Sequence, residues 1–272
     1  MIFTDIGITV TDGAMGSLVH ARRPDLEGPS ALWSLTAPEV VEEVHRDYVG
    51  AGARVIVTNT FLATRAWLPE GAPPVAQVNA AAVALERRAA GASAAVAGDT
   101  GPAGAKSFDE AVDNHLEQIA ALVAAGVDLL LVETMPTLAD LRAALTAASA
   151  AASSVPVIAS MTFDGMCRSR DGATPIDLVA LAEEFDAAAV GVNCCVGPAS
   201  ALEAVRDLVA ATRLPVVARP SAGLPAIRDG RAVFPVDDAA MAVWARRFVA
   251  AGARAIGGCC GTTPATIREI AA

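Results

Sequence analysis

Three cysteines stand at the ends of two apolar runs. Cys194 follows one run, and Cys259 with Cys260 closes the last one, inside the segment Gly-Gly-Cys-Cys-Gly at 257–261. Neighbouring side chains of a strand point to opposite faces, so this pair can share one ligand only where the chain leaves strand geometry. The three glycines of the segment supply that freedom, because glycine adopts positive φ at low cost.

Three thiolates around one point suit a soft ion with tetrahedral coordination, such as zinc (Zn²⁺). A fourth position left for substrate is typical of a catalytic site, whereas a structural zinc site is closed by four protein ligands. The cysteines therefore predict a catalytic zinc site. The alternative interpretation is that Cys259 and Cys260 are two small buried residues that pack at the end of a strand.

The elements that must position these cysteines are apolar, often β-branched runs separated by helix-like segments. Near-continuous hydrophobicity is typical of parallel strands that are covered on both faces. The expected strands are Ile8–Thr11, Arg54–Thr60, Ala94–Gly98, Leu129–Glu133, Pro156–Thr162, Ala188–Asn193, Pro215–Arg219 and Ala255–Cys259. Eight strands alternating with helices over 272 residues predict an α/β fold of the (β/α)8 TIM barrel type, and an open doubly wound sheet is the competing architecture.

Start and stop signals frame the helices between these strands. Helix N-termini are expected at Thr36-Ala-Pro-Glu, Ser107-Phe-Asp-Glu and Thr263-Pro, and terminal glycines at Gly52, Gly126 and Gly252. Because no linker, charge block or low-complexity tract divides the chain, residues 1–272 are expected to form a single domain.

Composition excludes several classes of protein. A hydrophobic content of 54% with 18% charged residues indicates a large core. A net charge of −10 argues against nucleic acid and anionic membrane surfaces as partners. Charges such as Asp128 interrupt the apolar runs before they reach the length of a membrane span, and the first residues lack a signal-peptide pattern. Five cysteines, an odd number, fit a reduced, cytoplasmic compartment.

Polar residues or thiols follow every expected strand. In order they are Asp12, Thr58 to Thr60 with Asn59 between them, Asp99, Glu133, Thr162, Asn193 with Cys194, Arg219 with Ser221, and Cys259 with Cys260. In a barrel the catalytic groups lie at the C-terminal ends of the strands. The three cysteines therefore fall at the expected active face, after the sixth and eighth strands.

Several of these segments together resemble the homocysteine S-methyltransferase family. They are Asp12-Gly-Ala-Met-Gly-Ser, Thr58-Asn-Thr-Phe, Gly98-Asp-Thr-Gly-Pro, Glu133-Thr, Gly191-Val-Asn-Cys and Gly257-Gly-Cys-Cys-Gly-Thr-Thr-Pro. The resemblance runs from Thr11 to about Ile267, and its two cysteine motifs are the most specific. It implies a zinc-bearing (β/α)8 barrel that methylates homocysteine to methionine, with Cys194, Cys259 and Cys260 as the zinc ligands.

By the same resemblance, Asp12 and Glu133 hold the amino-acid end of homocysteine. Asn59 and Asp99 are further candidates for substrate binding, because they follow neighbouring strands. Cys195 is expected to be a packed neighbour of the ligands and Cys167 a bystander in a charged loop. His20, His45 and His115 are expected to have surface or capping roles.

One departure from the family concerns the fourth zinc position. Ser221 stands where the methionine synthase branch often carries an asparagine that can fill this position when substrate is absent. The sequence also ends after the expected barrel, without a folate or cobalamin module. A small methyl donor is therefore expected, and a sulfonium such as S-methylmethionine or S-adenosylmethionine is favoured because it leaves as a neutral thioether.

Aromatic content bears on the donor as well. With 4% aromatic residues, an aromatic cage for a quaternary ammonium such as betaine is hard to assemble, and Trp33, Phe61 and Trp67 are the candidates near the first strand ends. Two alternatives to the stand-alone enzyme remain. One is a homocysteine-activating subunit that works with a corrinoid protein in a methionine synthase, and the other is a non-catalytic barrel that binds zinc and thiols.

Overall fold

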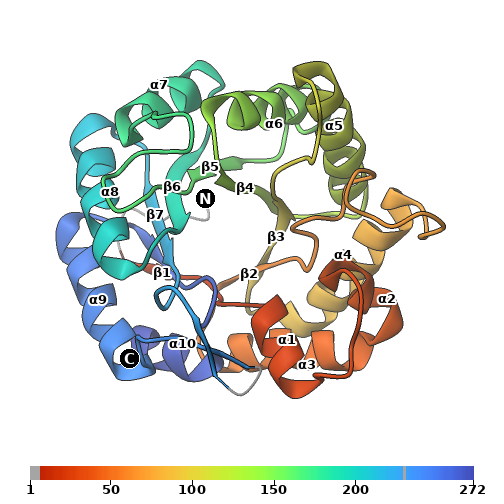
Figure 1. Cartoon of the computed structure of the whole chain (residues 1–272), viewed down its shortest axis with the longest axis horizontal. Coiled ribbons are helices and arrows are strands. Elements are labelled where there is room, and N and C mark those ends of the chain that lie inside the picture. Colours follow the sequence, from red (N-terminus) through yellow and green to blue (C-terminus); the bar gives the residue numbers. More distant parts are fainter. Residues whose placement is uncertain (1–6, 229–230) are drawn as a thin grey trace.

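Eight parallel strands form a ring in the computed structural model, which describes residues 7–228 and 231–272 (Figure 1). Their order in the sheet is β1–β10–β7–β6–β5–β4–β3–β2. A parallel bridge between Thr11 and Val55 joins β1 to β2 and closes the ring. The strands are β1 (Thr9–Val10), β2 (Val55–Val57), β3 (Ala95–Thr100), β4 (Leu129–Met135), β5 (Val157–Met161), β6 (Ala189–Cys194), β7 (Val216–Pro220) and β10 (Ala255–Ile256). The predicted barrel is thus confirmed, and the open sheet is excluded.

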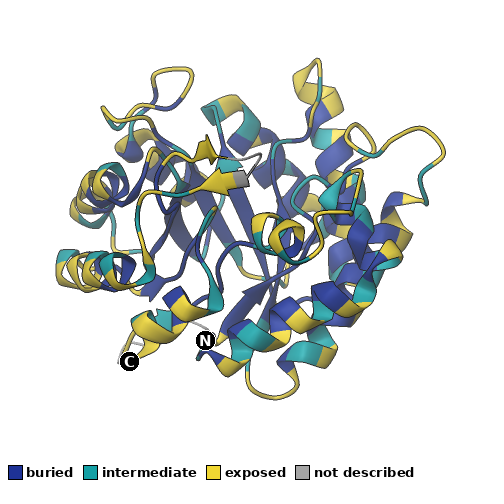
Figure 2. Ribbon diagram, turned by 60° about the horizontal axis from the view of Figure 1, so that its bottom comes forward, coloured by how far each residue is buried: buried dark blue, intermediate teal, exposed yellow. Residues whose placement is uncertain are grey.

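Helices surround the ring, and their inner faces are buried whereas their outer faces are exposed (Figures 1 and 2). They are α1 (Gly16–Arg22), η1 (Ser30–Leu32), α2 (Trp33–Thr36), α3 (Pro38–Gly50), α4 (Val75–Ala90), α5 (Phe108–Ala124), α6 (Leu138–Ala151), α7 (Pro175–Glu184), α8 (Pro198–Ala211), α9 (Asp238–Ala251) and α10 (Pro264–Ala271). Within the described residues, no helix is long and apolar enough to cross a bilayer.

The helix signals read from the sequence are largely confirmed. The Ser107 side chain accepts a hydrogen bond from the Glu110 N–H at the start of α5, and Thr263 caps α10 in the same way. Gly52, Gly126 and Gly252 follow helices with φ of 111°, 87° and 105°. Thr36 does not cap α3: it ends α2, and α3 begins at Pro38 without a side-chain cap.

Successive side chains of each strand point alternately into the barrel and toward the helices, so the core has an inner and an outer part. The residues that point into the barrel form one apolar cluster, which consists of Val55, Val57, Ala97, Leu129, Leu131, Ile158, Ala189, Val217 and Ala255. Two larger clusters fill the space between strands and helices. Side chains two positions further along a strand point the same way. Asp99, Glu133 and Arg219 therefore form a polar layer directly above Ala97, Leu131 and Val217.

Strands β2 and β10 each end three residues earlier than predicted, and β1 and β5 are one residue shorter at each end. Strand β2 ends at Val57 instead of Thr60, since the Val57 N–H donates to the Asp12 carboxylate and Thr60 turns back onto Thr58. Strand β10 ends at Ile256 instead of Cys259. A hairpin of β8 (Ala226–Arg228) and β9 (Arg231–Val233) follows β7 and was not predicted; its strands are only three residues long.

The expected surface or capping roles of two histidines are wrong. His45 on α3 and His115 on α5 are fully buried, while His20 on α1 is exposed. Both buried histidines lie on helix faces that pack inward. The helical spacing of apolar residues could have predicted this burial, because Val41 and Val44 on α3 and Ile119 on α5 are buried on the same faces as the histidines.

Candidate metal and substrate site

The sulfur atoms of Cys194, Cys259 and Cys260 lie together at the C-terminal ends of the strands. The Sγ–Sγ distances are 3.3 Å from Cys194 to Cys259, 3.9 Å from Cys194 to Cys260 and 4.0 Å from Cys259 to Cys260. Cys194 ends β6, and the other two follow β10. Because only β7 lies between these strands in the sheet, the parallel strand order brings together thiols that are 65 positions apart in the sequence.

This cluster fits a zinc ion on its donor set. Tetrahedral coordination with Zn–S bonds of about 2.3 Å separates thiolate ligands by about 3.8 Å, close to the distances between these atoms. Among the described residues it is the one group of His, Cys, Asp and Glu side chains arranged to hold a metal ion. Three protein ligands leave one tetrahedral position for a substrate atom.

The two remaining cysteines lie outside the cluster. The Cys195 sulfur accepts a hydrogen bond from the Phe163 N–H at 3.4 Å, and the Cys167 thiol donates to the Ser200 carbonyl at 3.8 Å. Burial raises the pKa of the Cys195 thiol to about 12 and also raises the pKa of Cys167. Both thiols are therefore protonated and unreactive at neutral pH.

Glycines shape the loop that carries Cys259 and Cys260, although for two different reasons. Gly261 has a φ of 82°, as the sequence led us to expect for the whole segment. Gly257 and Gly258 have no positive φ and are needed for space instead. A Cβ at Gly257 would lie 2.0 Å from the Thr11 hydroxyl, and one at Gly258 would lie 2.3 Å from that of Thr262.

Backbone hydrogen bonds hold the cysteine loops in register with β7. The Cys259 N–H donates to the Pro220 carbonyl, and the Ser221 N–H donates to that of Cys194, both at 2.9 Å. The Ser221 hydroxyl donates to the Cys195 carbonyl at 3.2 Å. Ser221 thus supports the loop of Cys194, and it does not line the cavity beside the cysteines.

A cavity of about 290 Å³ opens beside the three sulfur atoms. Its lining combines the cysteines with a few polar side chains and several apolar ones. The lining residues include Gly13, Ala14, Met15, Gly16, Ser17, Ser30, Val57, Thr58, Asn59, Phe61, Asp99, Glu133, Thr134 and Arg219. Of the predicted site residues, only Asp12 is absent from this lining. An enclosed space with convergent polar groups is typical of a small-molecule site.

Glu133 reaches the cavity from the end of β4. The next residue, Thr134, has a φ of 57°, and its N–H donates to the Asn193 side-chain oxygen at 2.8 Å. One Glu133 oxygen, Oε2, is buried without a hydrogen-bond partner. Burial, opposed by the Arg219 charge and reinforced by Cys259 and Asp12, raises the pKa of Glu133 to about 8.

Asp99 is fixed through its backbone, whereas one oxygen of its carboxyl group is left free. The Asp99 N–H donates a hydrogen bond to the Thr58 hydroxyl at 2.8 Å, and the Asp99 carbonyl accepts one from the Thr60 hydroxyl at 2.7 Å. The Oδ1 atom is buried without a partner. Burial and the neighbouring charge of Glu133 raise the pKa of Asp99 well above its ordinary value.

Asp12 lies behind the cavity and is already engaged. Its Oδ2 accepts from the Val57 N–H, and its Oδ1 accepts from Nη1 of Arg219, both at 2.8 Å. Burial raises the pKa of Asp12, while the adjacent Arg219 charge opposes that rise. The sequence places Arg219 among the strand-end residues but predicts no role for it. The signal was an arginine inside a buried strand, which must find anionic partners.

Asn59 occupies the rim between β2 and the segment before α2. Its Nδ2 donates to the Ser30 carbonyl at 2.7 Å and to the Ser34 hydroxyl at 3.2 Å. Asn59 and Ser30 both line the cavity. The amide therefore fixes the η1 segment against the barrel mouth.

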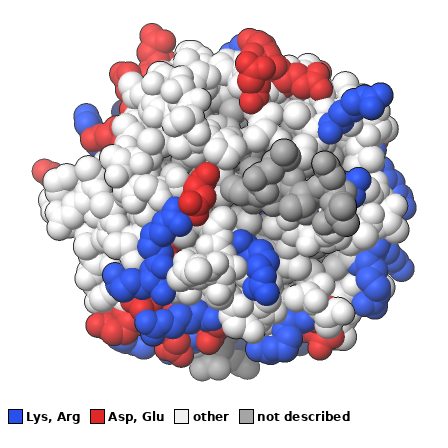
Figure 3. Space-filling view, turned by 180° about the vertical axis from the view of Figure 1, so that it is seen from behind, with Lys and Arg blue, Asp and Glu red and all other residues white. Residues whose placement is uncertain are grey.

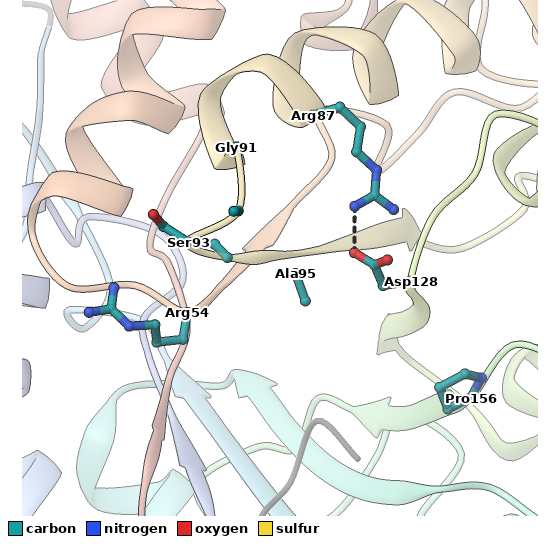
Figure 4. Close-up of a pocket in the computed structure, with 9 residues that line it drawn as sticks. Arg54, Arg87, Gly91, Ser93, Ala95, Asp128 and Pro156 are labelled. Carbon is teal, nitrogen blue, oxygen red and sulfur yellow. Dashed lines mark hydrogen bonds and ion pairs between the residues drawn. The ribbon is translucent and has the colours of Figure 1, made fainter.

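A second hollow, of about 750 Å³, lies at the opposite ends of the strands (Figure 4). Arg54, Arg87 and Asp128 line it, and Arg87 Nη1 donates to Asp128 Oδ2 at 2.7 Å. Viewed from behind, the molecule carries basic and acidic side chains interspersed among the residues drawn (Figure 3). Among the described residues that line this hollow there is no cysteine, and its one carboxylate, Asp128, is paired with Arg87.

The sequence profile of the homocysteine S-methyltransferase family matches residues 9–272. The chain belongs to this family. The chain is also similar to methionine synthase of Mycobacterium tuberculosis, with 32% sequence identity over 97% of this chain. This chain spans 24% of the length of that relative and of the similar one from Mycobacterium leprae.

Solved structures in the family give a match over the full barrel. The metallated form of the homocysteine methyltransferase MmuM from Escherichia coli has a TM-score of 0.82 and 29% identity to this chain. The match covers 98% of this chain and 96% of MmuM. The apo form of MmuM gives a TM-score of 0.79 at the same identity.

Proposed function

We propose that this protein transfers a methyl group to the thiol of homocysteine and so forms methionine. The observation that carries the proposal is the three-thiol cluster beside a cavity that holds buried, unpartnered carboxyl oxygens. The first feature suits a thiol substrate and the second suits an ammonium group. Homocysteine carries both groups on one small molecule.

Cys194, Cys259 and Cys260 would hold the metal, with zinc as the proposed ion because three thiolates favour it. The metallated form of MmuM supports a bound metal ion without identifying the ion for this chain. When bound, zinc lowers the pKa of a coordinated thiol, which keeps a substrate sulfur nucleophilic at neutral pH.

The residues of the cavity bind and orient the amino-acid end of the substrate. Glu133 and Asp99 offer carboxyl oxygens to the ammonium group, and Asn59 holds the rim of the site. No histidine lines the cavity among the described residues. The chain therefore contributes positioning and charge, and such orientation is worth large factors in rate.

For the methyl donor we propose a small sulfonium such as S-methylmethionine or S-adenosylmethionine. Among the described residues, Phe61 is the one aromatic residue of the cavity lining. Trp33 is buried in the core, and Trp67 donates from an exposed position to the Pro102 carbonyl. A single ring does not form an aromatic cage, so betaine is disfavoured. The thiols and carboxyl groups of the lining favour a cationic donor over an anionic one.

The alternative donor is a corrinoid protein, with this chain as the homocysteine-activating part of a larger assembly. The likeness to methionine synthases supports it, because the chain matches only a quarter of those proteins. A cytoplasmic location also remains a prediction from the sequence, as does the organisation of residues 1–272 as one domain.

The deciding experiment combines metal analysis with a methyl-transfer assay on the purified chain. Homocysteine is supplied with S-methylmethionine, S-adenosylmethionine, betaine or methylcobalamin in separate reactions, and methionine is quantified. About one zinc per chain and turnover with a sulfonium support the proposal. Turnover with methylcobalamin alone supports the alternative, and zinc-loaded protein that forms no methionine with any of the four donors contradicts the proposed methyl transfer.

A further inference from the structure

Arg219 is a buried cation that reaches across the barrel from β7 to two other strands. Its Nη1 donates to Asp12 Oδ1 at 2.8 Å and to the Thr11 hydroxyl at 2.7 Å, both at the end of β1. Its Nε lies 3.7 Å from Oε2 of Glu133, at the end of β4. The three charged side chains are each less than a tenth exposed.

Arg219 is hydrogen-bonded on the β1 side of this bridge but not on the β4 side. Toward β1, every contact has the length of a hydrogen bond. Toward β4, Arg219 Nε and Glu133 Oε2 are both buried and have no hydrogen-bond partner. A separation of 3.7 Å is too long for a hydrogen bond. The guanidinium is thus anchored on Asp12 and Thr11 and presents a free donor to Glu133.

We propose that Arg219 is a positioning residue for the amino-acid end of the substrate: it holds Glu133 in the orientation that pairs with the ammonium group. Asp12 then acts through Arg219, by fixing the guanidinium, and does not itself contact the ammonium. This inference rests on the proposed function, because it assigns roles within the proposed homocysteine site.

Electrostatics favour this division of roles. Asp12, Asp99 and Glu133 surround the site, and Arg219 is the cation among them. A buried carboxyl group becomes neutral when no positive charge stabilises it. By pairing with Asp12 and lying beside Glu133, Arg219 favours the ionised form of both. An ammonium group needs an ionised partner.

The test compares Arg219→Lys with wild type in the presence of saturating methyl donor. Lysine keeps the charge, but its single nitrogen cannot reach both Asp12 and Glu133 as the planar guanidinium does. We expect the homocysteine KM to rise about tenfold or more, because a misplacement of about 1 Å is costly. The kcat, the donor KM and the zinc content stay within about twofold. The matched control is Arg206→Lys, in the exposed ion pair with Glu203 on α8.

A second pair of variants separates the indirect role of Asp12 from a direct one. If Asp12 acts through Arg219, Asp12→Asn raises the homocysteine KM, and the double variant with Arg219→Lys is no worse than the poorer single variant. Additive effects on KM would show that Asp12 contacts the substrate and would overturn its indirect role. An unchanged KM in Arg219→Lys overturns the role of Arg219, whereas a wild type that neither binds nor methylates homocysteine overturns the proposed function.

Discussion

Cys194 and Cys195 are neighbours in the chain, yet their sulfur atoms have separate surroundings. Both residues have left-handed backbone angles, with φ of 59° and 60°. Left-handed geometry costs about 1–3 kcal/mol for a residue with a side chain, so the fold must compensate for it. The turn leaves Cys194 beside Cys259, while Cys195 accepts a hydrogen bond from the Phe163 N–H. Of the two adjacent cysteines, the strained turn therefore places only Cys194 in the cluster with Cys259 and Cys260.

This difference allows a matched test of the metal site, because the same substitution can be made at two adjacent cysteines of which only Cys194 belongs to the cluster. Cys194→Ala is expected to lose most of the bound zinc and the methyl-transfer activity. Cys195→Ala is the control, and it should retain about one zinc per chain. The measurement is metal content by mass spectrometry after dialysis, with circular dichroism to confirm folding. Equal zinc loss in both variants would contradict the assignment of ligands.

The raised pKa of Glu133 predicts that homocysteine binding depends on pH. Its pKa of about 8 means that the carboxyl group is largely protonated at neutral pH in the ligand-free protein. Since the ionised form pairs with the ammonium group, this residue should make binding tighter as the pH rises toward 8 and beyond. Glu133→Gln should weaken binding and remove this component, while zinc content is retained.

The substrate thiol also loses a proton when it binds a metal, so wild type and Glu133→Gln must be compared across the same pH range. Calorimetric titration with homocysteine between pH 6 and pH 9 gives both affinity and proton release, around the pKa of about 8 for Glu133. A constant ratio of the two affinities over this range would show that Glu133 does not titrate on binding.

At the scale of the elements, local sequence patterns predicted what local physics controls. Parallel strands buried on both faces were visible as apolar runs, and the Ser107 and Thr263 caps were visible from their spacing. The bridge from Arg219 to Asp12 joins residues 207 positions apart, so no local pattern could reveal it. The resemblance to a family pointed to Asp12, but only the folded barrel shows that its oxygens are already engaged.

Helices α3 and α4 contain a buried pair, His45 and Glu86, that the sequence pattern did not predict. His45 Nδ1 lies 3.5 Å from Glu86 Oε1, both side chains are inaccessible to solvent, and none of their polar atoms has a hydrogen-bond partner. Burial lowers the pKa of His45 to about 3 and raises that of Glu86 well above its ordinary value. Both groups are therefore neutral in the folded protein and destabilise it through unsatisfied polar atoms.

Replacing the pair by apolar residues of similar size should stabilise the protein. We expect the double variant His45→Leu with Glu86→Met to gain about 1–4 kcal/mol in the free energy of unfolding. The two groups have opposite pH dependences. Below pH 6.5, unfolded wild type takes up a proton on His45 that the folded state refuses until its pKa of about 3, whereas above pH 4.5 it releases a proton from Glu86 that the folded state retains. These effects cancel between pH 6.5 and 4.5, so the gain should stay nearly constant there and grow only on further acidification toward pH 3. Urea unfolding at pH 7, pH 5 and pH 3.5 measures the gain and its pH dependence, and a less stable double variant would contradict the prediction.

At the scale of the whole molecule, the site is a polar layer and a set of loops placed on an apolar barrel. Beneath Asp99, Glu133 and Arg219, the inner cluster is entirely apolar, and the outer clusters pack the helices without contribution from the three ligand cysteines. Hydrogen bonds between β7 and the cysteine loops hold the thiols in place before any metal arrives. Folding and metal binding are therefore expected to be separable.

Zinc removal tests this separation. After chelation, the protein should keep its far-ultraviolet circular dichroism and unfold in a single cooperative transition, because the core does not depend on the metal. The melting temperature should fall, since a ligand that binds only the folded state stabilises it by about 2.7 kcal/mol at a free concentration 100 times its dissociation constant. Added zinc should restore both the melting temperature and activity, whereas Cys194→Ala should melt at the lower temperature with or without zinc. Loss of helical signal on chelation would show instead that the metal holds the barrel together, as in small zinc-dependent domains.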